Sequence, residues 1–585
     1  MDQDSPKQSS RANSIGTVPE TAQPIHSTNL QQPKSDLEPS SESPPLLTGL
    51  PRELLGNIVD RLENSDIKNL RLSCKLLAST SALRINRVFL SANPLNVKVF
   101  RAIADHEEYR HGVTEIIYDD ARLPRSAFEA QAIRRPEMLI AGPRPDPLTP
   151  WEAEFQSTAQ EADEEWFQSA RKANLWEIGA HKSHTKGQWD SLAREKQAES
   201  EMSYPASWAY YQNLVSQQDQ VIASGADREA FIYGLRQFTS LRTVTVTPAA
   251  HGMLFSPLYK TPMIRAFPFG FNYPLPRGWP ARREPESPLD AAPWVDEERE
   301  AWARQVRENW RGFLLVACAL SQERQHHHVS EFLIDSNQLQ TGIGCRLFEQ
   351  PCEASIDVVS ILTLPGLRRF CLSLNVEGQY LYNWQAFRSG LLKDALSKAV
   401  DLEQFALATD MDMEDPDEEE PPSLEDIIPI NCWPKLQHLK LWNFHVKKSE
   451  LLLFLAQLPQ TLKLLELGVL FFYDGARYLD LLQDMRDILG WQQRQIRPSV
   501  KIALPRRGYY RDGQTVELNK EIDDFLYNGG NNPFAGKPTR SGVPRGVGVI
   551  RDAFLADFEQ PWELPRWQLA AQSRRSLDKI LGRDG

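Results

Sequence analysis

Short segments in which hydrophobic and polar residues alternate recur along this chain, and they constrain its fold more than any other feature. Their common form is Leu-x-x-Leu-x-Leu, with Phe at the second hydrophobic position in some copies. Alternation over about six residues predicts a strand that buries one side and exposes the other. Seven segments have this pattern: residues 113–118, 241–246, 329–334, 367–374, 402–407, 436–441 and 462–467.

Helix-like segments precede most of these predicted strands. Residues 384–400 and 449–458, for example, carry hydrophobic side chains at the 3.6-residue period of a helix. The strand pattern resembles the strand half of a leucine-rich repeat, in which the polar residues face out on a concave surface. Because the spacing is irregular, we interpret residues 92–505 as an α/β solenoid of degenerate leucine-rich-repeat-like units.

Two insertions interrupt the predicted array. Residues 151–220 are charged, rich in Trp and mostly helical in pattern, and we expect their Trp side chains to fill a local core. Residues 268–293 are dense in Pro, Arg and aromatic residues, which predicts a long irregular loop. Beyond Pro505 the regular pattern fades, so we expect residues 506–585 to form a partly disordered C-terminal tail.

The first 43 residues are rich in Ser, Gln, Pro and Thr, which predicts a disordered tail without the hydrophobic core of a signal peptide. No stretch approaches the roughly 18 consecutive apolar residues that a membrane helix needs. The few scattered cysteines favour a reducing compartment without disulfides. We therefore expect a protein of the cytoplasm or nucleus that does not bind membranes.

A short helical motif is predicted between this tail and the repeats, over residues 44–91. Hydrophobic residues between Leu50 and Leu62 follow helical spacing, and Pro51 occupies the first turn, where its missing N–H costs nothing. A second helix is expected after Asn64, and a third short segment from Ser81. A unit this small buries little surface by itself, so its two hydrophobic faces predict contacts with the rest of the chain and with a partner.

The motif resembles the F-box, by which substrate receptors dock onto the Skp-type adaptor of cullin–RING ubiquitin ligases. The matching residues are Leu50-Pro51, Glu53-Leu54, Ile58, Leu62, Asp66-Ile67, Leu70 and Cys74-Lys75. In that family the Leu-Pro start and the helix faces that follow it insert into the adaptor. The resemblance therefore implies an adaptor-binding set of Leu50, Pro51, Leu54, Ile58, Leu62, Ile67 and Leu70.

The whole chain resembles the leucine-rich-repeat F-box proteins, particularly the large fungal-type ones. The resemblance implies a non-enzymatic substrate receptor of an SCF-type E3 ubiquitin ligase, which binds the adaptor and ligase core at one end and an unknown protein substrate through its repeats. An alternative is an interaction scaffold that binds the adaptor, or another partner, without promoting ubiquitination. We expect the substrate to contact residues in or just after the strands: Arg369, Gln437, His438 and Trp442.

Composition and motifs argue against other classes of function. The net charge of −12, from 66 basic and 78 acidic residues, is opposite in sign to the charge of a typical protein surface that binds nucleic acid. A metalloenzyme or hydrolase that uses His326, His327 and His328 is a third hypothesis, but no further ligand follows at a zinc-like interval. We favour a polar turn at these histidines and expect neither a metal nor a cofactor.

Overall fold

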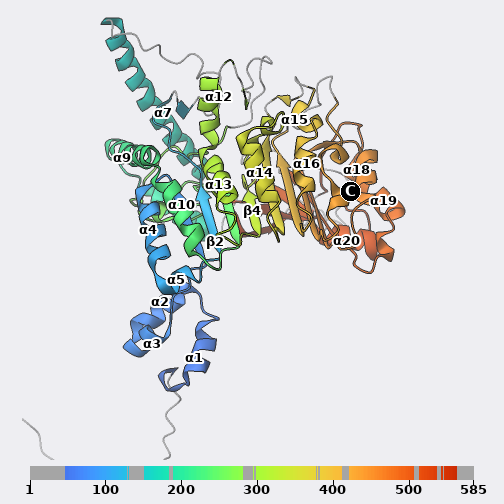
Figure 1. Ribbon diagram of the computed structural model, residues 1–585, viewed down its shortest axis with the longest axis horizontal. Helices are drawn as coiled ribbons and strands as arrows, with labels where there is room; N and C mark the ends of the chain where they lie inside the picture. Colours follow the sequence, from blue (N-terminus) through green and yellow to red (C-terminus); the bar gives the residue numbers. More distant parts are fainter. Residues whose placement is uncertain are drawn as a thin grey trace, which may run out of the picture. The chain divides into compact units, whose positions relative to one another are not determined.

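The computed structural model has two compact units, residues 1–83 and residues 84–585, which are described separately (Figure 1). The N-terminal tail expected to be disordered, residues 1–43, lies outside the described residues. The structure describes residues 47–127, 129–130, 150–182, 189–280, 294–295, 298, 300–376, 378–379, 383–411, 420–505, 513–536, 542–544 and 546–562.

The first unit consists of short helices around a small core. A 3₁₀ turn, η1, precedes three α-helices, and the buried side chains of Leu55, Val59, Ile67 and Leu77 meet between them. The extended backbone of Cys74 ends the second helix, and its Sγ accepts a hydrogen bond from the Leu77 N–H and so caps the third. The elements are η1 (Leu47–Gly49), α1 (Arg52–Val59), α2 (Asn64–Ser73) and α3 (Lys75–Thr80).

Two details of the expected motif are corrected. Its third helix is α3, which ends before Ser81, whereas the sequence pattern predicted a segment that begins there. The last residues of the expected motif form β1 (Arg87–Ser91), which pairs with the large sheet of the second unit and not with the helical motif. The pairing of this strand shows to which unit it belongs.

The second unit is mixed α/β and, within its described residues, has a 13-stranded, mostly parallel sheet. All seven strands predicted from the alternation are confirmed. The parallel strands are β1, β2 (Glu115–Asp119), β3 (Thr243–Thr247), β4 (Glu331–Ile334), β6 (Arg369–Asn375), β7 (Gln404–Thr409), β8 (His438–Trp442), β10 (Leu464–Gly468) and β12 (Ser499–Pro505), with β5 (Ile343–Gly344) beside β6.

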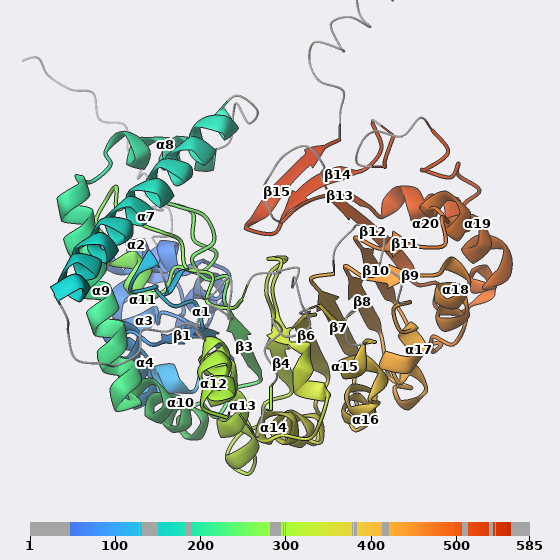
Figure 2. The ribbon, with the colours of Figure 1, turned by 90° about the horizontal axis from the view of Figure 1, so that it is seen from above.

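Helices cover one face of this sheet, and the strands line the inner side of the resulting arc (Figure 2). The principal covering helices are α4 (Pro94–Asp105), α10 (Ala226–Gln237), α13 (Arg311–Gln322), α14 (Glu353–Leu362), α16 (Leu391–Ser397), α18 (Lys448–Ala456), α19 (Tyr478–Ile488) and α20 (Lys520–Tyr527). The helix predicted over residues 384–400 is in fact two short helices, α15 (Gln385–Arg388) and α16, because Gly390 has a φ of 80° that interrupts them.

The core lies between the sheet and these helices, and the strand register assembles it. Phe332, Phe370 and Phe405 occupy equivalent positions on β4, β6 and β7 and are fully buried. Their ring centroids are 6.2 and 6.3 Å apart. Burial of one such side chain contributes about 1.5–3 kcal/mol. The alternate residues of each strand face away from the helices, and we call this side of the sheet the inner face.

The insertion is helical, as expected, and comprises α7 (Pro150–Lys182), α8 (Trp189–Glu199) and α9 (Tyr204–Ser224). Trp166 and Trp208 pack around buried Phe167, but Trp176 is 71% exposed, so the Trp residues fill the local core only in part. In the predicted loop, residues 268–280 are irregular and include fully buried Trp279, while residues 281–293 lie outside the described range.

Part of the C-terminal segment, which was expected to be partly disordered from residue 506, forms regular structure within the described residues 513–536, 542–544 and 546–562. Three strands there extend the sheet beyond β12, each antiparallel to the strand before it, and α20 packs on the covered face of the sheet. They are β13 (Gln514–Leu518), β14 (Val549–Asp552) and β15 (Leu555–Pro561). In the part of the chain that the structure describes, no helix combines the length and hydrophobicity needed to cross a membrane.

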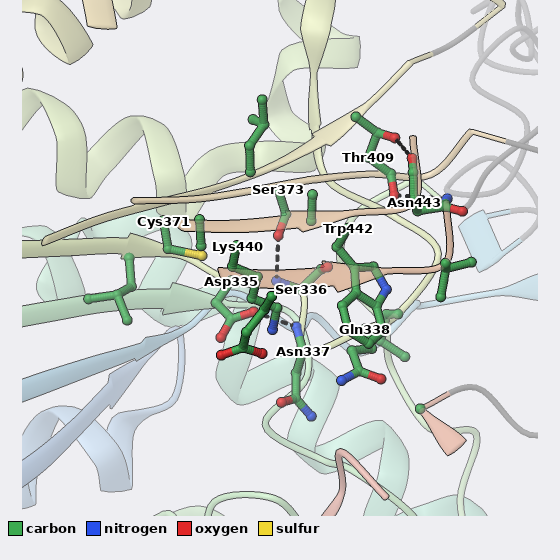
Figure 3. Close-up of a pocket in the computed structure, with 18 of the residues that line it drawn as sticks. Asp335, Ser336, Asn337, Gln338, Cys371, Ser373, Thr409, Lys440, Trp442 and Asn443 are labelled. Atoms are coloured by element: carbon green, nitrogen blue, oxygen red, sulfur yellow. Dashed lines mark hydrogen bonds between the residues drawn. The ribbon is translucent and has the colours of Figure 1, made fainter. Parts of the chain in front are cut away.

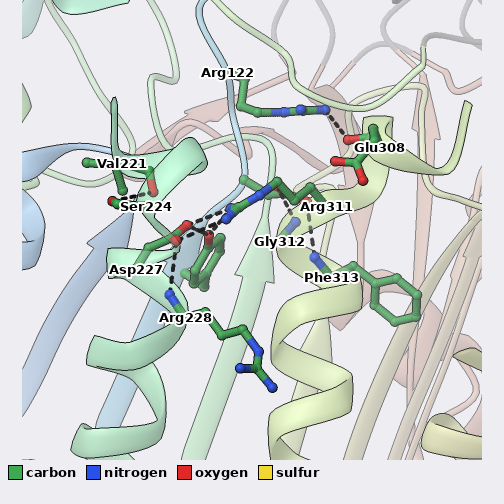
Figure 4. A network of polar contacts seen from close by, with 11 residues as sticks. Arg122, Val221, Ser224, Asp227, Arg228, Glu308, Arg311, Gly312 and Phe313 are labelled. Atoms are coloured by element: carbon green, nitrogen blue, oxygen red, sulfur yellow. Dashed lines mark hydrogen bonds and ion pairs between the residues drawn. The ribbon is translucent and has the colours of Figure 1, made fainter. Parts of the chain in front are cut away.

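Buried polar contacts join β2 to α10 and α13 (Figure 4). Arg311 donates two hydrogen bonds to the Asp227 carboxylate, at 2.6 and 3.0 Å, and the Tyr118 hydroxyl donates a third at 2.7 Å. Asp120 accepts hydrogen bonds from the backbone N–H groups of Gly312 and Phe313 in the first turn of α13, where a carboxylate is favourable. These contacts fix the first half of the sheet against its helices.

Candidate functional site

A cavity of about 530 Å³ opens on the inner face over β6, β7 and β8 (Figure 3). Its floor consists of small side chains that are cross-strand neighbours: Cys371 beside Ala406, and Ser373 beside Ala408. Larger side chains at these positions would fill the space. The cavity therefore exists because these two cross-strand pairs consist of small residues. Its volume lies within the range of about 300–1,000 Å³ that is typical of ligand sites.

Trp442, at the end of β8, forms one wall. Its ring lies against Gly468 of β10, where an added Cβ would come within 2.1 Å of the indole. Lys440 Nζ lies 4.9 Å from the centroid of the same ring, at the distance of a cation–π contact. Close packing against a glycine thus holds the indole in place, and only 8% of Trp442 is exposed.

The segment after β4, residues 335–340, forms the opposite wall. Asn337 and Gln338 have φ values of 51° and 64°, in the left-handed region that non-glycine residues seldom adopt. The Asn337 N–H donates to Asp335 Oδ1 at 2.8 Å, and its side-chain amide donates to the Ala553 carbonyl at 3.0 Å. This unusual backbone conformation brings the side-chain amides of Asn337 and Gln338 to the cavity. Residues with strained backbone often lie in functional sites.

Charges alternate across the inner face beside the cavity. Lys440, Glu466, Lys501, Glu517, Arg551 and Glu559 lie on β8, β10, β12, β13, β14 and β15, and we call this series the charge ladder. Lys501 Nζ lies 3.5 Å from Glu466 and 2.9 Å from Glu517. Arg551 continues the series, at 3.6 Å from Glu517 and 2.6 Å from Glu559.

Glu466 has basic residues on both sides in the sheet. His438 Nε2 lies 2.9 Å from Glu466 Oε1. Burial alone would raise the pKa of the Glu466 carboxyl, but the contact with His438 and the charges of Lys440 and Lys501 outweigh it and lower the pKa to about 2. The carboxylate is therefore ionised at every physiological pH.

The Cys371 thiol on the cavity floor is not activated. Burial raises its pKa to about 12, and the charge of Asp335 acts in the same direction against the weaker effects of Lys440 and Arg369. Because only the thiolate is a good nucleophile, Cys371 is an unreactive neutral group at neutral pH. The cavity is thus suited to binding through its amides, charges and indole.

Three of the four residues expected to contact a substrate line this cavity: Arg369, His438 and Trp442. Gln437 does not line it and accepts a hydrogen bond from Lys463 at 2.8 Å. The expectation missed Lys440 and Glu466, although both lie on the inner face predicted by the strand alternation. It also missed Asn337 and Gln338: the run Asp335-Ser336-Asn337 is typical of a turn, but nothing in it indicates that the turn lies beside a cavity.

The seven residues expected to bind an adaptor are not equivalent in the first unit. Leu54 and Ile58, one turn apart on α1, are 51% and 37% exposed, and Pro51 is also exposed. Ile67, however, is fully buried in the core of the unit, so it supports the exposed face from within. Leu50, Leu62 and Leu70 are half-buried.

A second polar cluster is buried in the second unit. His251 Nδ1 lies 2.8 Å from the Tyr273 hydroxyl, and His251 Nε2 lies 3.9 Å from Asp119 Oδ2. Burial, with a smaller effect of neighbouring Asp120, raises the pKa of Asp119 to about 8, and burial with the charge of Arg277 lowers the pKa of His251 to about 3. The cluster is largely uncharged at neutral pH and closed to solvent.

The histidine triplet has separate contacts. His326 Nδ1 lies 3.0 Å from Glu323, and buried His327 Nε2 lies 3.1 Å from the Leu320 carbonyl. His328 is exposed. The triplet leads into β4, in agreement with a polar turn, and among the described residues no three His, Cys, Asp or Glu side chains converge as metal ligands.

Comparison of the chain with protein-family models and with curated proteins found no match.

Proposed function

We propose that this chain is a substrate-receptor subunit of an SCF-type cullin–RING ubiquitin ligase. The first unit would bind the Skp-type adaptor, and the inner face of the second unit would bind the protein substrate. The observation that carries the proposal is the exposed pair Leu54 and Ile58 on α1, in a small unit with its own core. Both residues lie in the segment that resembles an F-box.

The exposed hydrophobic surface of the first unit supports this assignment. Besides Leu54 and Ile58, Leu72 and Leu76 are 84% and 44% exposed. Single exposed aliphatic side chains are common, but several in one small unit indicate a binding surface. An adaptor that covers them would gain about 25 cal/mol for each Å² of apolar surface removed from water.

The second unit has features that support its interpretation as a degenerate leucine-rich-repeat-like solenoid. Its parallel strands alternate with helices, and side-chain hydrogen bonds recur where the strands end. The Asn375 amide donates to Asp410 at 2.8 Å, and the Asn443 amide donates to the Thr409 carbonyl at 3.0 Å. Such an array presents an extended surface to a partner. A receptor of this kind acts by holding the substrate near the ligase-bound ubiquitin, which raises the effective concentration.

Co-purification of the full chain with a Skp-type adaptor tests the proposal. The Leu54→Asp/Ile58→Asp variant should lose the adaptor, because a carboxylate buried in an apolar interface without a partner costs several kcal/mol. Both residues are outside the core of the unit, so the helices should still fold. Leu453→Asp is the matched control, since Leu453 is 64% exposed on α18.

Failure of the wild-type chain to retain the adaptor would contradict the proposal. If the adaptor binds but no captured protein undergoes ubiquitin-dependent turnover, the chain is a scaffold and not a receptor.

A further inference from the structure

The charge ladder ends at the cavity, and its last charge is Lys440. In the strand register, Lys440 of β8 lies between Glu466 of β10 and Ala406 of β7. Cys371 of β6 is the next residue beyond Ala406. Neither of these neighbours is charged at neutral pH. Within the described residues, no carboxylate forms a direct ion pair with Lys440, whereas every other member of the ladder has one. An anion above Ala406 would continue the alternation.

Arg369 borders the same space from β6. Its side chain is 45% exposed, and its ion pair with Glu331 is long, at 3.5 Å. Gln404 separates it from His438 in the strand register, and all three residues line the cavity. Because His438 is already held by Glu466 at 2.9 Å, the cations available to a ligand are Lys440 and Arg369.

Two carboxylates also line the cavity, and they limit the charge that it accepts. Glu466 faces His438, Lys501 and Lys440, whereas Asp335 forms no ion pair with any described residue that lines the cavity. With these two carboxylates already beside the cavity, a ligand with a single negative charge suits the two cations Lys440 and Arg369. A doubly charged phosphate would place excess negative charge near Asp335 in a partly desolvated space, where like charges repel strongly.

Two buried polar atoms in the cavity wall have no hydrogen-bond partner within the described residues. They are the Gln338 Oε1 and the Thr515 Oγ1, and Thr515 is only 4% exposed. Such atoms normally have a partner, and their position in a binding cavity indicates that a ligand supplies it. One accepts and the other can donate or accept, so together they suit the N–H and C=O groups of a peptide backbone.

We infer that this cavity binds the carboxylate side chain of an Asp or Glu in an extended substrate peptide, with Lys440 and Arg369 as its cationic contacts. The wall residues Gln338 and Thr515 hydrogen-bond the adjacent peptide backbone, and the Trp442 indole packs on the side chain. The identification of the ligand as a peptide rests on the proposed receptor function. Its charge follows from the ladder.

Peptide pools provide the test. The immobilised full chain is incubated with degenerate nine-residue pools whose central residue is fixed as Asp, Glu, Asn, Gln or phosphoserine. Retention of the Asp and Glu pools should exceed that of the Asn and Gln pools about tenfold or more, the factor expected for charge-assisted hydrogen bonds. Equal retention of acidic and amide pools overturns the inference, and strongest retention of the phosphoserine pool overturns the assignment to a carboxylate.

Matched variants locate the site. Lys440→Met should abolish the preference for acidic pools. Lys501→Met removes the same charge from the next cation of the ladder, outside the cavity, and should retain the preference. Ala406→Leu fills the cavity without changing its charge and should reduce retention of all pools. Equal loss of the preference in Lys440→Met and Lys501→Met would show that the preference comes from the general electrostatic potential of the inner face and not from a binding site at Lys440.

Controls separate this inference from the receptor proposal. Thermal unfolding of each variant confirms that it is folded. Peptide retention needs no adaptor, so Leu54→Asp/Ile58→Asp should leave it unchanged, and Lys440→Met should leave adaptor co-purification unchanged. Failure of the peptide preference with intact adaptor binding overturns only the inference, and the reverse result overturns only the proposed function.

Discussion

Two ion pairs of the second unit differ in their contact with water, although each joins a carboxylate to a basic side chain. The pair between Asp227 and Arg311 joins α10 to α13, with side-chain exposures of 0% and 15%. The ladder ends in Arg551 and Glu559, with exposures of 43% and 52%. Breaking a buried pair leaves a charge without solvent, whereas breaking an exposed pair returns both groups to water.

This difference separates charges on which the fold depends from charges that remain exposed to solvent. The buried network fixes the first half of the sheet, so its residues tolerate little change. The ladder lies on the inner face, and its exposed members contribute little to the free energy of unfolding.

The largest expected effect follows from Asp227→Asn. The change leaves the Arg311 guanidinium nearly buried without a counter-charge, which should lower the free energy of unfolding by about 3–5 kcal/mol. Urea-induced unfolding of the full chain measures it. Glu229→Gln is the matched control on the same helix, because its pair with Arg101 is exposed at both ends. Equal losses in the two variants would contradict the distinction between buried and exposed pairs.

A pH-dependent effect is expected from Asp119. Its pKa is about 8 in the folded chain, against 3.8 for the ordinary carboxyl, so between these values the folded state binds a proton that the unfolded state has lost. Stability therefore falls as pH rises through this window, with a slope of at most about 1.4 kcal/mol per pH unit.

Asp119→Asn should remove this slope, because Asn resembles the protonated carboxyl and does not titrate. The free energy of unfolding is measured from pH 5 to pH 8 for both proteins. The difference between variant and wild type should increase with pH in favour of the variant. His251 titrates in both proteins and cancels from the comparison. A constant difference across the range would show that Asp119 is ionised in the folded chain.

The smallest effect is expected from Glu559→Gln at the exposed end of the ladder. Its 2.6 Å pair with Arg551 lies in water, so the free energy of unfolding should change by less than about 1 kcal/mol. Added salt should reduce the difference further, since screening weakens exposed pairs. A loss as large as that of Asp227→Asn would show that the ladder is structural.

Seven strands of the parallel sheet could be predicted because their signal is local. Leu439 and Leu441 alternate with His438 and Lys440, and this alternation alone identifies both the strand and its two faces. Three of the four expected substrate contacts line the cavity for the same reason. The strands β13 to β15 were missed because their segments lack that leucine pattern and are stabilised by pairing with β12 and with one another.

Sequence by itself determined the period-two strands, the helical insertion and the hydrophobic helices of the first unit, because these patterns depend on neighbours a few residues apart. Only the tertiary structure decided that Ile67 is buried while Leu54 is exposed, although both lie on hydrophobic faces. It also placed Asp410 in a buried contact with Asn375. Burial is set by packing between segments distant in sequence, and the cavity arises in the same way.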